Sequence, residues 1–129
     1  MTAPTAILLV PTEAGAALLD WDPDGDVLLR GNVMWYVARP PRVVLPDGRR
    51  ALPLWQDGAV HAEGWDRARR ACAELPRDQR PTGPLWGWLH DFRPTCDDAL
   101  VLAQFLEAAG LCRVVLLDLV DGQLRERAP

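Results

Sequence analysis

Apolar residues in the first part of this chain come in short runs, and after residue 62 they change to a helical spacing. The run Ala6–Val10, stopped by a proline, predicts a buried first strand. Val27–Arg30 and Asn32–Arg39 also predict strands, whereas residues 14–20 fit either a further strand or one turn of helix. The first half of the chain therefore indicates a sheet of short strands.

Four Asp-Gly dipeptides divide the chain, at Asp24-Gly25, Asp47-Gly48, Asp57-Gly58 and Asp121-Gly122. At least three of them stand between apolar runs. Glycine adopts the positive φ that tight hairpin turns need, and aspartate can hydrogen-bond its own backbone there. The clearest hairpin joins Val43–Leu45 to Arg49–Trp55, in which Pro53 predicts an edge strand or a bulge. These turns predict antiparallel pairing.

Two later segments have helical spacing. In Glu63–Leu75 the apolar residues recur three or four positions apart, which predicts one buried face, with Arg67 and Arg70 turned to solvent. Thr95–Gly110 is predicted as a helix because it starts with an N-cap threonine, carries Asp98 where a capping box needs it, and ends in glycine.

The segment Arg113–Val120 predicts a strand inside the sheet, in which Asp118 needs an arginine partner or a strand end that reaches water. Strands, then helices, then strands favour a single α+β domain over residues 1–129. We expect a mostly antiparallel sheet built from hairpins, with two or three helices from residues 63–110 packed on one face.

Composition narrows the function mainly through what is missing. The chain has no lysine and no serine, so a serine nucleophile, a Schiff-base lysine and a phosphate loop with its lysine are excluded. A net charge of −4 and scattered arginines disfavour nucleic acid as a partner. Residues 1–10 lack the basic start of a secretory signal, and no apolar run is long enough to span a bilayer. A cytoplasmic protein with no membrane partner is expected.

One thiol could support catalysis. Cys96 lies just inside a predicted helix start, where backbone N–H groups lower a thiol pKa, and His90 is near enough to serve as its base. Asp97 and Asp98 oppose thiolate formation, so an incidental cysteine is the favoured interpretation.

A carboxylate cluster could hold a cation. Asp20, Asp22, Asp24 and Asp26 match the first half of a calcium-binding loop, but Gly31 stands where that loop needs its glutamate. The same residues suit an ordinary hairpin turn, which is the favoured interpretation. We therefore expect no catalytic residue, no metal and no cofactor.

The candidate partner-binding surface is an aromatic segment beside the proline-rich residues 76–84. It consists of Leu85, Trp86, Trp88 and His90, with Arg77, Arg80 and Arg93 as a polar rim. Tryptophan is enriched at the centres of protein interfaces, and prolines lower the entropy lost when a loop is ordered.

These features favour a non-catalytic cytoplasmic binding or accessory module that contacts a protein partner or a second copy of itself. A small enzyme using the Cys96–His90 pair or the aspartate cluster is the alternative. The segment Val43–Trp65, two strands around Pro-Asp-Gly and a helix start, is similar to several small α+β domains of unknown or regulatory role, including the SseB-like group. The similarity covers this segment alone and assigns no family.

Overall fold

The computed structural model describes residues 3–21, 27–30, 35–38, 43–45, 47–76, 78 and 94–128. Its strands are β1 (Ala6–Pro11), β2 (Val27–Arg30), β3 (Trp35–Ala38), β4 (Val43–Val44), β5 (Arg50–Gln56), β6 (Ala59–Val60), β7 (Cys112–Val120) and β8 (Gln123–Glu126). Its helices are α1 (Glu13–Leu18), α2 (Ala62–Ala73) and α4 (Cys96–Ala108).

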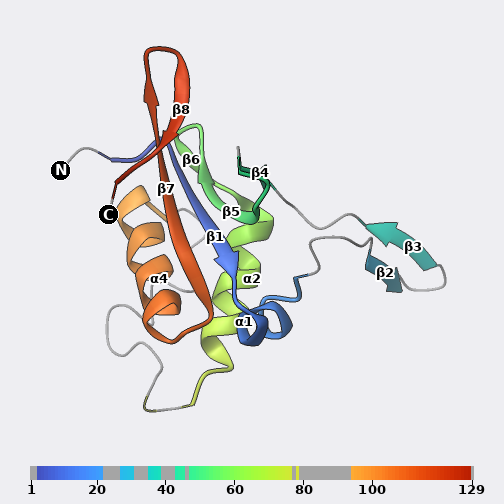
Figure 1. The fold of residues 1–129 in the computed structure, drawn as a ribbon. Helices are drawn as coiled ribbons and strands as arrows, with labels where there is room; N and C mark the ends of the chain where they lie inside the picture. Colours follow the sequence, from blue (N-terminus) through green and yellow to red (C-terminus); the bar gives the residue numbers. More distant parts are fainter. Residues whose placement is uncertain are drawn as a thin grey trace.

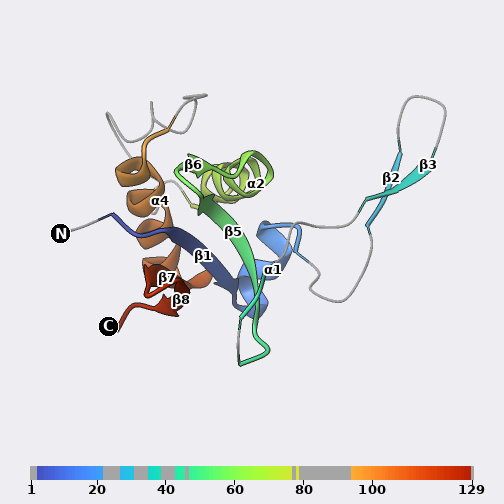
Figure 2. The same ribbon diagram turned by 90° about the horizontal axis from the view of Figure 1, so that it is seen from above.

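Six strands form one antiparallel sheet in the order β4-β5-β1-β7-β8, with β6 paired to β5, while β2 and β3 pair with each other. The sheet curls into a half-barrel, and the helices pack against it (Figures 1 and 2). The α+β class with a hairpin-built antiparallel sheet is thereby confirmed. None of the helices in the described ranges is long and apolar enough to cross a membrane.

The two faces of the sheet are covered differently. On β1, Ile7 and Leu9 join the larger apolar cluster with residues of the three described helices, and we call this side the helix face. Ala6 and Leu8 point the other way, into a smaller cluster that contains only residues of strands and their connections. We call this second side the open face, because no described helix contributes to it.

Pro53 lies at an irregularity in the sheet, as its sequence context predicts. The register between β1 and β5 shifts between Ile7 and Leu8, so that Ile7 pairs with Trp55 and Leu8 with Pro53. One residue of β5 is therefore extra, which is how a β-bulge places a proline inside a sheet. The helix α2 lies close to the sheet at this point, since a Cβ added at Gly64 would lie 1.7 Å from the Pro53 carbonyl oxygen.

Both long helices occur where the sequence predicts them. In α4, Thr95 and Asp98 form the capping box: the Thr95 N–H donates to Asp98 Oδ2 at 2.9 Å, and the Asp98 N–H donates to Thr95 Oγ1 at 3.2 Å. At the other end, Gly110 has φ +79° and Leu111 N–H donates to the Leu106 carbonyl at 3.0 Å. This pattern ends the helix and turns the chain into β7.

The segment 14–20, whose sequence fits either a strand or one turn of helix, contributes most of α1. Thr12 caps it by accepting a 3.1 Å hydrogen bond from the Gly15 N–H. Of the two alternatives for residues 14–20, the turn of helix is confirmed, because α1 ends at Leu18. The Asp24-Gly25 dipeptide itself lies outside the described residues, and β2 pairs with β3.

The later Asp-Gly dipeptides form the expected hairpins. Asp57 and Gly58 have φ of 53° and 80°, and Asp121 and Gly122 have φ of 52° and 78°. Two successive positive φ values define the tight turn whose twist matches antiparallel strands. The turns close the β5–β6 and β7–β8 hairpins, and the second hairpin projects beyond the rest of the sheet (Figure 1).

Candidate functional site

The aromatic partner surface predicted from sequence lies outside the part of the chain that the structure describes. This applies to Leu85, Trp86, Trp88 and His90 and to their arginine rim, Arg77, Arg80 and Arg93. The surface stays a prediction. Of the proposed Cys96–His90 pair, the structure describes Cys96, while His90 lies outside the described residues.

Cys96 is the first residue of α4 and is half-buried. Burial raises the pKa of its thiol above the ordinary value, and the Asp97 carboxylate raises it further, while the Arg127 guanidinium lowers it. The balance favours the protonated thiol, which is the weaker nucleophile. The helix start therefore does not activate Cys96.

Asp20, the first residue of the aspartate cluster, is engaged by a buried arginine. Arg67 N–H groups donate to the backbone carbonyls of Leu19 and Asp20, and its Nε donates to Glu63 at 3.0 Å. The expectation that Arg67 faces solvent is wrong: it is 7% exposed, because the end of α1 supplies carbonyl acceptors above that side of α2. Asp22, Asp24 and Asp26 lie outside the described residues.

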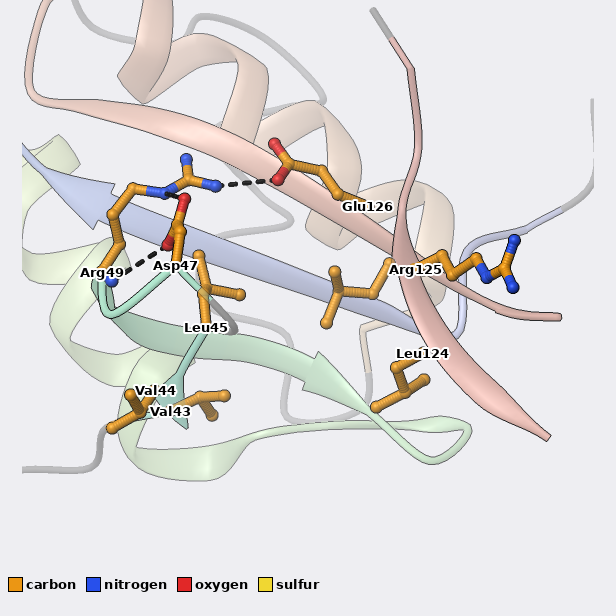
Figure 3. Close-up of a pocket in the computed structure, with 9 residues that line it drawn as sticks. Val43, Val44, Leu45, Asp47, Arg49, Leu124, Arg125 and Glu126 are labelled. Carbon is orange, nitrogen blue, oxygen red and sulfur yellow. Dashed lines mark hydrogen bonds and ion pairs between the residues drawn. The ribbon is translucent and has the colours of Figure 1, made fainter.

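A cleft of about 500 Å³ opens on the open face, between the β4–β5 hairpin and the β7–β8 hairpin (Figure 3). Its lining residues are Val43, Val44, Leu45, Asp47, Arg49, Leu117, Leu124, Arg125 and Glu126. The aliphatic side chains come from β4 and the residue after it on one side and from β7 and β8 on the other, and the curl of the sheet brings these sides toward each other. The cleft is therefore a product of the half-barrel shape.

The charged residues at one end of the cleft bind one another. Arg49 Nε lies 2.6 Å from Asp47 Oδ2, and Arg49 Nη2 lies 2.8 Å from Glu126 Oε2 (Figure 3). The hydrogen bond to Glu126, together with that to Asp47, raises the pKa of Arg49, and the backbone N–H of Arg49 lowers the pKa of Asp47. Arg125 points away from this group (Figure 3).

Exposed apolar side chains continue from the cleft along the projecting hairpin. Leu119, Val120 and Leu124 are 61%, 40% and 52% exposed, and Val44 on β4 is 63% exposed. Leu119 and Leu124 are paired across the hairpin, and both lie on the open face because Leu117, two residues from Leu119, is part of its core. The hairpin thus presents unburied leucines next to the cleft.

On the opposite side of the same hairpin, Asp118 has the arginine partner that its position in a strand predicts. Arg127 donates from Nε and Nη2 to the two carboxylate oxygens at 2.8 and 2.6 Å. These bonds hold the pKa of Asp118 below its ordinary value. The pair ties the end of the chain to β7.

Sequence reasoning did not find the cleft. It identified the β4–β5 hairpin but did not connect Arg49 with Glu126, which is 77 residues away. One signal was present: the Asp121-Gly122 turn fixes the register that pairs Leu119 with Leu124, so an apolar stripe on the hairpin could have been predicted.

Comparisons of this chain with protein families, with curated proteins and with solved structures find no match. Within the described residues, no group of three or more His, Cys, Asp or Glu side chains could hold a metal ion.

Proposed function

We propose that this chain is a non-catalytic cytoplasmic binding or accessory module that acts through protein–protein contacts on the open face of its sheet. The observation that carries the proposal is the aliphatic cleft between two hairpins, with exposed leucines continuing along the β7–β8 hairpin. Contiguous exposed apolar surface rimmed by charge is typical of interaction sites.

The chemistry of the cleft supports binding over catalysis. Arg49 forms ion pairs with both Asp47 and Glu126, and most of the other lining side chains are aliphatic. A general acid or base normally has a perturbed pKa near the working pH and a route to substrate. Here the raised pKa of Arg49 and the lowered pKa of Asp47 keep both groups charged at neutral pH.

The proposed location rests on the cysteines. Cys72, Cys96 and Cys112 form no disulfide, and Cys72 and Cys112 are buried. A small domain whose cysteines form no disulfide fits a reducing compartment, where disulfides are rare.

An interaction experiment with one cleft variant and one matched control tests the proposal. Val44→Asp places a carboxylate at the mouth of the cleft on an exposed position, and Ala59→Asp places one on the exposed strand β6 away from it. Tagged wild type and variants are used to capture partners, and circular dichroism checks folding. We expect Val44→Asp alone to lose partners. If folded Val44→Asp keeps every partner of wild type, the cleft is not the contact surface.

The predicted aromatic surface is tested with separate variants in the same experiment. Trp86→Ala and Trp88→Ala test the prediction from sequence independently of the cleft. Partners lost in these variants but kept in Val44→Asp would move the binding site from the open face to the aromatic segment.

The enzyme alternative is tested through Cys96. Because its pKa is raised, we expect iodoacetamide to modify Cys96 near neutral pH no faster than free cysteine. Modification well above the free-cysteine rate, lost in His90→Ala, would establish the Cys–His pair and contradict a non-catalytic role.

A further inference from the structure

The outer edge of β8 is an unsatisfied strand edge within the described part of the chain, where β8 pairs with β7 alone. Arg127 N–H donates to the Leu116 carbonyl at 2.7 Å, so residue 127 turns its backbone groups toward β7. Backbone groups alternate in direction along an antiparallel strand. Leu124 and Glu126 therefore turn their N–H and C=O groups outward, where another strand can pair with them.

Apolar exposure concentrates on this same hairpin. Among the described residues, the large apolar side chains with high exposure are Val44, Leu119, Val120 and Leu124, and three of these four belong to β7 and β8. An exposed edge with apolar side chains is a template for pairing with another chain. The coincidence of free backbone groups and exposed leucines singles out β8 as an interaction edge.

We propose that β8 of a second copy of this chain pairs with β8 in antiparallel orientation. The two strands are related by a two-fold axis at Leu124, so that Leu124 of one copy faces Leu124 of the other. The inference rests on the proposed function and deepens it, because it names one partner of the module. The two sheets then join edge to edge, and their open faces form one continuous surface.

Symmetry restricts the possible registers. A two-fold axis perpendicular to a sheet keeps every side chain on its own face, and directly opposed residues share a face. A residue of one copy can then face only residues of the other copy whose numbers differ from its own by zero or an even number. One residue of β8 must therefore face the same residue of the other copy, and the axis lies midway between these two residues.

Charge selects among the remaining registers. An axis through Arg125 would oppose two guanidinium groups, and an axis through Glu126 would oppose two carboxylates, both of which are unfavourable. An axis through Gln123 would place Leu124 opposite the turn residue Gly122 and shorten the overlap. Only Leu124 on the axis opposes two apolar residues and sets Gln123 beside Arg125 of the other copy.

The backbone agrees with this register. With Leu124 on the axis, its outward N–H donates to the C=O of Leu124 in the other copy, and the reverse bond follows by symmetry. On the open face, Leu119 and Leu124 of both copies then form a row of four leucines, because Leu119 and Leu124 already pair within one copy. The row covers side chains that are more than half exposed in one copy, at 61% and 52%.

The charged residues beside Leu124 disfavour other registers but do not prevent pairing at Leu124. Charged residues on an edge strand normally block association. Here Glu126 is bound by Arg49 at 2.8 Å, and the Arg125 side chain extends away from this ion-paired group (Figure 3). Neither charge lies in the leucine row, so both penalise the alternative registers only.

Disulfide trapping tests the register. In a Cys96→Ala background, Leu124→Cys, Arg125→Cys and Glu126→Cys are each oxidised at equal concentration and analysed on non-reducing gels. Paired strands bring opposed Cα atoms within disulfide range. We expect Leu124→Cys to give covalent dimer ahead of the other two. Stronger trapping of Arg125→Cys or Glu126→Cys, or equal absence of trapping in all three, would overturn the proposal.

Sedimentation velocity tests the dimer without covalent capture. Wild type should form a concentration-dependent dimer, and Leu124→Arg should raise its dissociation constant about tenfold or more, because two cations meet on the axis. Ala59→Arg, at an exposed position on β6 away from both β8 and the cleft, should dimerise as wild type does. A wild type that stays monomeric, or a Leu124→Arg variant that dimerises normally, would exclude this interface. Loss of partners in Val44→Asp with no dimer would leave the proposed function standing and remove only this inference.

Discussion

Leu8 and Leu9 are neighbours on β1, and both side chains are fully buried, but they lie in different surroundings. Leu9 packs under the helices in the larger cluster, whereas Leu8 belongs to the small cluster of the open face. Helices close the first face, and the curl of the sheet alone encloses the second. One face is therefore covered by helices, and the other carries a smaller core and the cleft.

The sharpest test of this difference compares Leu9→Ala with Leu8→Ala. We expect Leu9→Ala to cost about 4 kcal/mol and Leu8→Ala about 2 kcal/mol of unfolding free energy, within the range for buried leucines. The helix face leaves a closed cavity, whereas water or the cleft residues can fill space on the open face. Urea unfolding measures both. Equal losses would mean that the open face is packed as rigidly as the helix face.

The close approach of α2 to the sheet gives the next largest effect. Gly64→Ala should cost about 3 kcal/mol, because its Cβ would lie 1.7 Å from the Pro53 carbonyl oxygen and backbone must move. Gly58→Ala is the control, since Gly58 has open space but a φ of +80°. It should cost about 1 kcal/mol for the left-handed conformation alone. A Gly64→Ala protein as stable as the control would show that α2 can shift without loss.

His61, at the N-terminus of α2, makes the helix face sensitive to pH. Its Nδ1 accepts from the Gly64 N–H at 3.1 Å, and burial lowers its pKa from the ordinary 6.5. The unfolded chain then binds the proton more readily, so stability is full above about pH 6.5 and declines as pH falls below it.

The size of this pH effect should not exceed about 1 kcal/mol, the usual contribution of an N-cap at a partly exposed position. His61→Asn keeps a cap without titrating and should remove the decline between neutral and mildly acidic pH. His90→Asn, which changes the other histidine, should retain it. Thermal melts across that range distinguish the two, and a decline that persists in His61→Asn would assign it elsewhere.

The ion pair between Asp118 and Arg127 should give the smallest effect. Both side chains are partly exposed, at 31% and 21%, so water screens their attraction. A double-mutant cycle with Asp118→Asn and Arg127→Gln measures the coupling in urea. Because the pKa of Asp118 is lowered from 3.8, its contribution is present above that pH and is lost as pH falls through the folded pKa. A coupling larger than the His61 effect would contradict this order.

The sequence predicted features that depend on near neighbours. Thr95 and Asp98 define the start of α4, and Asp121-Gly122 defines a hairpin, because each needs only a few adjacent residues. The burial of Arg67 depends on carbonyls at the end of α1, which pattern alone does not place. The cleft requires the curl that brings Arg49 to Glu126, so it follows from the tertiary structure.

The strand order also constrains how this chain folds during synthesis. β1 is made first but lies at the centre of the sheet, between β5 and β7. Its pairing with β7 joins Leu9 to Val114, so one flank of β1 stays open until β7 has been made. Such long-range pairing slows folding and exposes the apolar run of β1 to aggregation in the meantime. A nascent chain that stops before β7 therefore carries an unprotected Ile7-Leu8-Leu9 edge, which is a natural target for chaperones.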